Sequence, residues 1–145
     1  MSGEQRIGYT TGVYDLFHIG HLNLLQRAKE NCDHLIVGVS IDELVEYKGK
    51  RSVIPYEERR EIVSAIRYVD RVVAQKDMDK IAAWERLKFD VMFVGDDWKG
   101  TEKWNRIETD LSERGVELVY FSYTKGTSST LINQTLMNLR NGSPR

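Results

Sequence analysis

An alternation of short apolar runs with amphipathic segments along the chain constrains the fold more than any other feature. Runs such as Leu35–Ser40, which are nearly all apolar and rich in β-branched residues, are typical of strands buried on both faces. Strands are expected at Ile7–Thr10, Leu35–Ser40, Val72–Ala74, Val91–Val94 and Val116–Phe121. This order predicts an α/β fold, a doubly wound parallel sheet of five strands with helices on both faces.

The segments between these runs have the period of helices. Helices are expected at Ile19–Glu30, Asp79–Leu87 and Trp104–Glu113, and a last one is marked by Ile132, Leu136 and Leu139. Pro55 suits the first turn of another helix, whose apolar period continues to Val69. Residues 46–54 before it are expected to form a polar loop.

Length and composition narrow the class of protein. A chain of 145 residues is expected to form one domain, with residues 141–145 as a frayed tail. A net charge of -1 argues against a nucleic-acid partner or a membrane surface, and no apolar run is long enough to span a bilayer. The polar start of the chain lacks a signal peptide, and the single cysteine, Cys32, excludes an internal disulfide. These features predict a soluble cytoplasmic protein.

Ligands of doubly wound sheets bind beyond the carboxyl ends of the strands, so the loops after the strands are the places to search. The loop after the first strand contains His18 and His21, two of the three histidines of the chain. A helix that begins near Ile19 would put both imidazoles at its amino end, where N–H groups attract phosphate. Gly20 would let an anion approach the backbone. Two histidines there are suited to donate hydrogen bonds to a phosphorus-centred transition state.

Two other interpretations of the histidines remain. They are helix caps without a ligand, or they bind zinc together with Cys32 or His34. The zinc interpretation is weaker because the chain offers no well-spaced set of ligands.

Four motifs in order carry a resemblance to a known family. The segment Gly12–His21 resembles the signature of the HxGH nucleotidyltransferases, and Arg67–Asp70 resembles their "RYVD" segment. Gly95–Trp98 resembles the "GDDW" loop, and Lys125–Thr130 resembles the closing "RTEGISTT" segment. The chain is similar to the cytidylyltransferases from about Ile7 to Ile132, most closely to the bacterial glycerol-3-phosphate group.

The resemblance implies a Rossmann-like nucleotidyltransferase domain that transfers CMP from CTP to a small alcohol phosphate, most closely sn-glycerol 3-phosphate. The products would be CDP-glycerol and pyrophosphate. It further implies Mg²⁺ as cofactor, a homodimer, and a place in teichoic-acid or capsule synthesis.

The resemblance also implies roles for individual residues. The catalytic group would be His18, His21, Lys48 and Asp15. Nucleotide contacts are expected from Thr11, Gly12, Val13, Tyr14, Gly20, Arg67, Asp96, Gly126, Ser128, Ser129 and Thr130. Acceptor contacts are expected from Lys48, Lys50, Asp96, Trp98 and Val13. Arg59, eight residues before Arg67 and expected on the same helix face, is assigned to phosphate or to the subunit interface. No metal ligand is assigned.

Two departures from the family pattern keep alternatives open. Tyr123 stands where the family has an arginine near the triphosphate, and a tyrosine cannot replace a bidentate guanidinium. Lys125 is the candidate to supply the lost charge. Val13 replaces a threonine near the acceptor site. The alternatives are another acceptor, such as phosphoethanolamine or a polyol phosphate, ATP as donor, or a nucleotide-binding protein without activity.

Overall fold

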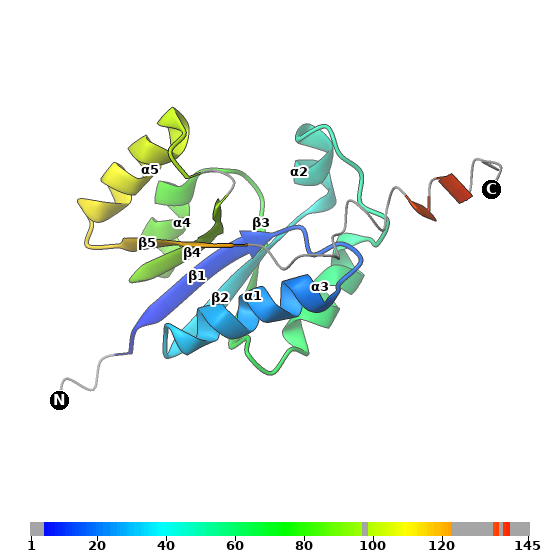
Figure 1. Cartoon of the computed structure of the whole chain (residues 1–145), viewed down its shortest axis with the longest axis horizontal. Helices are drawn as coiled ribbons and strands as arrows, with labels where there is room; N and C mark the ends of the chain where they lie inside the picture. Colours follow the sequence, from blue (N-terminus) through cyan, green and yellow to red (C-terminus); the bar gives the residue numbers. More distant parts are fainter. Residues whose placement is uncertain (1–4, 97–98, 123–134, 137, 140–145) are drawn as a thin grey trace.

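A computed structural model describes residues 5–96, 99–122, 135–136 and 138–139 (Figure 1). Within this part of the chain, parallel strands form one sheet in the order β3-β2-β1-β4-β5. The strands are β1 (Ile7–Gly12), β2 (His34–Ser40), β3 (Arg71–Gln75), β4 (Val91–Gly95) and β5 (Glu117–Phe121). The predicted five-stranded parallel sheet is therefore confirmed, with strand ends that differ from the expected ones by one or two residues.

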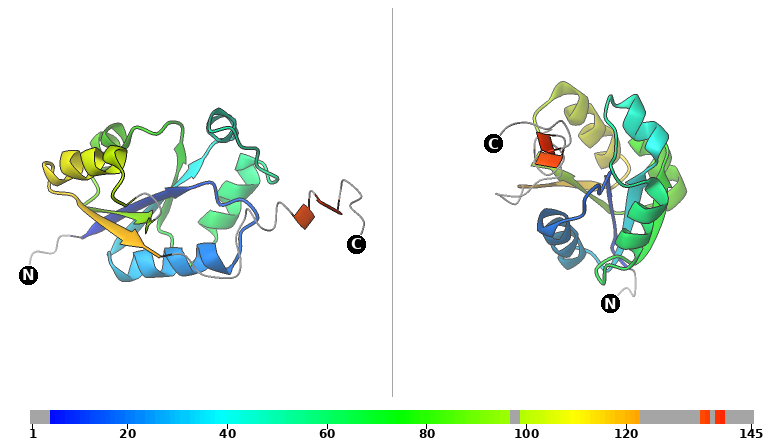
Figure 2. Two further views of the ribbon diagram at one scale, coloured as in Figure 1. Left: turned by 45° about the horizontal axis from the view of Figure 1, so that its top comes forward. Right: turned by 90° about the vertical axis from the view of Figure 1, so that its right-hand side faces the viewer.

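Helices cover both faces of the sheet, as predicted (Figure 2). They are α1 (Ile19–Glu30), α2 (Asp42–Tyr47), α3 (Tyr56–Ser64), α4 (Lys80–Leu87) and α5 (Glu102–Ser112). Leu25 of α1 and Val63 of α3 pack with Val37 on one face. Ala83 of α4 and Leu111 of α5 belong to a second cluster on the other face. The sheet separates these two apolar cores, which is the doubly wound arrangement.

The strand order sets where a ligand can bind. β1 pairs with β2 on one side and with β4 on the other, so that Tyr9 lies opposite both Ile36 and Met92. The chain winds outward from β1 in one direction and then from β4 in the other. The loops that follow β1 and β4 therefore diverge, which opens a crevice at the carboxyl edge of the sheet.

The structure corrects the sequence prediction between β2 and β3. Residues 42–47 form the short helix α2, which was not predicted and which buries Leu44 and Val45. Pro55 is the N-cap of α3 rather than a residue of its first turn. The helix ends at Ser64, five residues before the predicted end at Val69. Ile66 and Val69 still pack on the core cluster from the turn that follows, which explains why the apolar period outlasted the helix.

The other helices agree with prediction more closely. α1 has the predicted bounds, and Asp79 and Thr101 cap α4 and α5 by accepting hydrogen bonds from Ala82 and Trp104. Gly115 has a φ of 78°, the left-handed conformation expected where the chain leaves α5. The last predicted helix lies largely outside the described residues.

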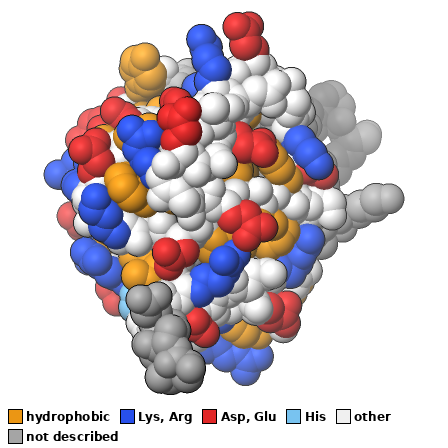
Figure 3. Space-filling view, turned by 90° about the vertical axis from the view of Figure 1, so that its left-hand side faces the viewer, with side chains coloured by type: hydrophobic (Ala, Val, Ile, Leu, Met, Phe, Trp, Pro, Cys, Tyr) orange, Lys and Arg blue, Asp and Glu red, His pale blue; other side chains and the backbone are white. Residues whose placement is uncertain are grey.

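The surface agrees with the near-zero net charge. On the face seen in Figure 3, acidic and basic side chains are interspersed and apolar side chains are scattered among them. None of the helices described here is both long and apolar enough to cross a membrane.

Candidate active site

His18 and His21 lie at the amino end of α1 and hold it in place reciprocally. His18 is the N-cap, and its Nδ1 accepts a hydrogen bond from the backbone N–H of Gly20 at 3.0 Å. The Nδ1 of His21 accepts a hydrogen bond from the backbone N–H of His18 at 3.1 Å. The ring centroids are 4.1 Å apart. Both rings therefore occupy the start of the helix, and these two N–H groups are used by the imidazoles rather than left for an anion.

These hydrogen bonds decide which ring nitrogen carries the proton. A neutral imidazole that accepts at Nδ1 must hold its hydrogen on Nε2. The Nε2 of His18 is buried and has no hydrogen-bond partner among the described residues. Both rings thus carry a donor at Nε2, the polarity that an anionic phosphate requires.

Burial keeps both imidazoles neutral near pH 7. Burial and the neighbouring His18 lower the pKa of His21 to about 4, although Asp15 acts in the opposite direction. Burial also lowers the pKa of His18 from its usual value. A bound phosphate would favour the charged forms, so the pair can accumulate positive charge when negative charge arrives or develops.

The loop between β1 and α1 is tightly constrained. Tyr14 and Leu16 have positive φ angles of 56° and 51°. A side chain at Gly12 would place its Cβ 2.9 Å from the Tyr14 ring, so only glycine fits there. The buried carboxylate of Asp15 accepts hydrogen bonds from the backbone N–H groups of Val53 (2.8 Å) and Ile54 (3.0 Å). Asp15 thus organises the neighbouring loop.

Lys48 and Lys50 are brought to the same edge of the sheet as the histidines. Lys48 caps α2, and Lys50 follows in the loop between α2 and α3, where both side chains are largely exposed. Burial of part of the Lys48 side chain, followed by the charges of Lys50 and Arg59, lowers the pKa of Lys48. Thr11 and Val13 are half-buried at the carboxyl end of β1, and Asp96 is exposed just after β4.

Lys80, which begins α4 after β3, is a buried cation near Lys48 that the sequence analysis did not single out. It is only 6% exposed, and no ion pair joins it to a carboxylate in the described part of the chain. Burial, followed by the charges of Lys48 and Lys103, lowers its pKa to about 8. As the first residue of α4 it also meets the positive end of a helix dipole. Sequence gave no signal because Lys80 looks like an ordinary polar residue in the first turn of a helix.

The two arginines do not share a helix face, contrary to prediction. Arg67 lies in the exposed turn after α3, where its guanidinium donates to the Tyr68 hydroxyl at 2.8 Å. Arg59 is completely buried. Neither phosphate contact nor subunit contact suits a guanidinium without exposed surface.

The alternative that the histidines bind zinc is wrong for the described residues, which contain no group of three metal-ligating side chains. Cys32 and His34 lie past the far end of the 12-residue helix α1, about 18 Å along its axis from the histidine pair.

Several predicted residues lie outside the described residues: Trp98, Tyr123, Lys125, Gly126, Ser128, Ser129 and Thr130.

Comparison with known proteins shows to which family the chain belongs. A family model described as cytidylyltransferase-like matches residues 9–135. The chain belongs to this cytidylyltransferase-like family. It is 41% identical over 128 residues to a glycerol-3-phosphate cytidylyltransferase of Staphylococcus aureus, covering 88% of this chain and 92% of the relative. A second relative of the family, an FAD synthase of Archaeoglobus fulgidus, is 37% identical and covers 75% of this chain and 79% of the relative.

Solved structures support the fold of this family member. A lipopolysaccharide core biosynthesis protein of Thermoplasma volcanium superposes with a TM-score of 0.71 at 24% identity. The alignment covers 86% of this chain and all of the other. At this level of identity the likeness concerns the fold alone, and it agrees with the predicted Rossmann-like domain.

Lys80 generates a prediction about stability. Because its pKa of about 8 lies below the ordinary 10.5, its charged form costs the folded state about 3 kcal/mol at neutral pH. Lys80→Met should raise the melting temperature at pH 7. Wild-type stability should recover relative to the variant as pH rises from about 8 to about 10.5, where only the unfolded state still binds the proton.

Thermal unfolding at pH 7 and pH 10 measures this difference. Lys76→Met, at an exposed lysine directly after β3, is the control and should leave the melting temperature nearly unchanged. A lower melting temperature for Lys80→Met at both pH values would show that the ammonium is stabilised by contacts other than those described.

Proposed function

We propose that the chain transfers CMP from CTP to sn-glycerol 3-phosphate and releases pyrophosphate. The observation that carries this proposal is the pair of neutral imidazoles, whose Nδ1 atoms accept backbone N–H groups and leave the hydrogen on Nε2, at the edge of the sheet where Lys48 and Lys80 also lie. The identity of 41% to a glycerol-3-phosphate cytidylyltransferase over most of both chains supports the choice of substrates.

The reaction needs no separate base. An oxygen of the acceptor phosphate, a dianion at neutral pH, attacks the α-phosphorus of CTP, and the bond to the bridging oxygen of pyrophosphate breaks. His18 and His21 would donate from Nε2 to the oxygens on the α-phosphorus, which gather negative charge in the transition state. Their lowered pKa values keep both rings neutral near pH 7, so that each holds a hydrogen on Nε2 while its Nδ1 accepts a backbone N–H.

Lys80, Lys48 and Lys50 are suited to receive the acceptor phosphate. The charges of Lys48 and Lys80 repel each other, and no carboxylate pairs with Lys80 in the described residues. A phosphate between them would relieve that repulsion and would bring the attacking oxygen to the crevice after β1. The energy gained by binding the acceptor phosphate would thus serve to orient its attacking oxygen.

We propose Mg²⁺ as the accompanying cation, held by the triphosphate. The described residues offer no cluster of three ligands, and Mg²⁺ in such enzymes commonly takes most of its oxygens from phosphate and water. It would neutralise the charge of the leaving pyrophosphate. A homodimer in the cytoplasm, serving teichoic-acid or capsule synthesis, completes the proposal by analogy with the family.

A second donor and acceptor pairing remains a candidate. One relative is named FAD synthase, and FAD contains an adenine nucleotide, so ATP remains a candidate donor. Val13 replaces a threonine near the expected acceptor, which favours a test of phosphoethanolamine and polyol phosphates.

A substrate panel tests the proposal directly. Pyrophosphate release is measured with Mg²⁺ for CTP and ATP, each against sn-glycerol 3-phosphate, phosphoethanolamine and a polyol phosphate. We expect release with CTP and sn-glycerol 3-phosphate. Release with another pairing only would contradict the substrates, and nucleotide binding without release on any pairing would indicate a protein without activity.

His18→Asn separates the two uses of the first histidine. Asparagine keeps a side-chain acceptor for the N–H of Gly20 but has no donor at the Nε2 position. We expect a melting temperature close to that of the wild type and a kcat lower by about 100- to 1,000-fold, the usual cost of removing one transition-state donor. Turnover within a few-fold of the wild type would contradict the role of the His18 Nε2–H.

The lowered pKa of Lys80 predicts the alkaline limb of the pH profile. Lys80 is charged below its pKa of about 8, so kcat/KM for the acceptor should fall as pH rises above 8. The value of kcat should persist to higher pH, because bound phosphate stabilises the ammonium. Lys80→Arg remains charged throughout and should move the limb upward, whereas an unchanged limb in this variant would assign it to another group.

A further inference from the structure

Arg59 ties together the segments that carry the site residues. Its guanidinium has no exposed surface and donates to the carbonyls of Ile54 (2.7 Å), Val13 (2.8 Å) and Ser40 (2.7 Å). It also donates to the Asp42 carboxylate at 2.6 Å. One rigid side chain therefore joins the loop after β1, the end of β2, the start of α2 and the loop before α3.

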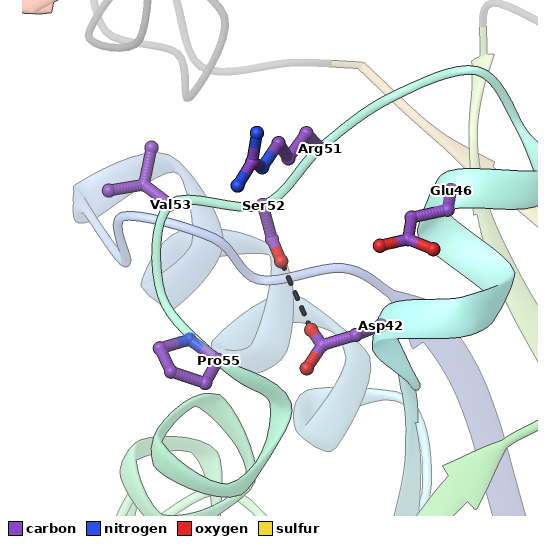
Figure 4. Close-up of a pocket in the computed structure, with 6 residues that line it drawn as sticks. All are labelled: Asp42, Glu46, Arg51, Ser52, Val53 and Pro55. Atoms are coloured by element: carbon purple, nitrogen blue, oxygen red, sulfur yellow. Dashed lines mark hydrogen bonds between the residues drawn. The ribbon is translucent and has the colours of Figure 1, made fainter.

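Asp42 holds this guanidinium in its orientation. Its carboxylate also accepts hydrogen bonds from the Ser52 hydroxyl and from the backbone N–H of Tyr56, both at 3.1 Å. Burial opposes the charged form, but these hydrogen bonds and Arg59 outweigh it and lower the pKa of Asp42. Figure 4 shows Ser52 reaching from its loop to Asp42 at the wall of a hollow of about 200 Å³.

The loop at 52–54 is fixed from both sides. Asp15 accepts hydrogen bonds from the N–H groups of Val53 and Ile54, while Arg59 donates a hydrogen bond to the carbonyl of Ile54. This loop follows Lys48 and Lys50 directly. The loop that carries the lysines and the loop that leads to His18 are thus bonded to each other by Asp15 and again through Arg59.

The carbonyl of Val13 is the critical acceptor. It immediately precedes Tyr14, whose φ of 56° is a conformation that residues with side chains rarely adopt. A charge-assisted hydrogen bond to a buried guanidinium compensates such a backbone conformation and prevents its relaxation. Displacement of this carbonyl would be carried along the loop toward His18 and His21.

We propose that Arg59, oriented by Asp42, is a positioning residue that sets the distance between the histidine pair and the Lys48–Lys50 loop. It touches neither substrate, and it acts through the Val13 and Ile54 carbonyls. The inference rests on the proposed nucleotidyl transfer, since it concerns the alignment of the two reacting phosphates.

Arg59→Lys tests this inference, because lysine keeps the charge but cannot hold all four acceptors in one plane. Both loops can still bind their ligands, so the KM values for CTP and for the acceptor should stay within about threefold of wild type. The value of kcat should fall by about 100-fold, as expected for a misplacement of about 1 Å. Asp42→Asn, which leaves Arg59 in place with a neutral partner, should give a smaller loss of kcat with the same pattern.

A matched control separates positioning from general loss of stability. Lys29 pairs with Asp70 at 2.6 Å near the amino end of β2, far from the site. Lys29→Met also removes a charged partner, and below its melting temperature it should keep the kcat of the wild type. A similar kcat loss in Lys29→Met and Arg59→Lys, or a kcat for folded Arg59→Lys within threefold of wild type, would overturn the inference.

Hydrogen exchange tests whether Arg59 fixes the two loops to each other without any measurement of turnover. In Arg59→Lys the amides of residues 13–17 and 52–54 should lose protection together, while those of β4 keep it. Unchanged protection in both segments would overturn the inference. If the wild-type protein releases no pyrophosphate on any pairing, the proposed function fails, and this exchange result still decides whether Arg59 fixes the two loops to each other.

Discussion

The central place of β1 in the sheet is the constraint on which the rest of the structure depends. A parallel sheet buried on both faces leaves no free edge near β1, because β2 and β4 occupy both of its sides. The chain must reverse its direction of winding there, and the loop after β1 is left over a crevice. Every group proposed to act on phosphate comes from a loop or a helix end in the connections that follow the strands at this edge.

The sheet and α1 could be predicted from sequence because their buried positions require apolar residues, and the spacing of those residues is visible in the sequence. The end of α3 could not, because Ile66 and Val69 pack into the core from a turn as well as they would from a helix. The first motif located the histidine pair. The burial of Arg59 and Lys80 could not be predicted for a common reason, since nothing in a sequence distinguishes a buried cation from a solvated one.

The site concentrates features that cost stability. A buried lysine without a described carboxylate partner and two left-handed residues in one loop both oppose folding. The two apolar cores and the Arg59 network offset these costs. Stability and activity therefore pull in opposite directions at this edge, as is common where a site must wait for an anionic ligand.

The reciprocal caps of His18 and His21 have a consequence for how the sequence can evolve. Each ring is oriented by a backbone group whose position the other ring helps to fix. Loss of the acceptor at either Nδ1 leaves one backbone N–H at the start of α1 without its side-chain partner. A replacement that keeps this acceptor but lacks the Nε2 donor is penalised in the chemistry alone, whereas one that lacks both is penalised in the helix as well, so each position is under two separable constraints.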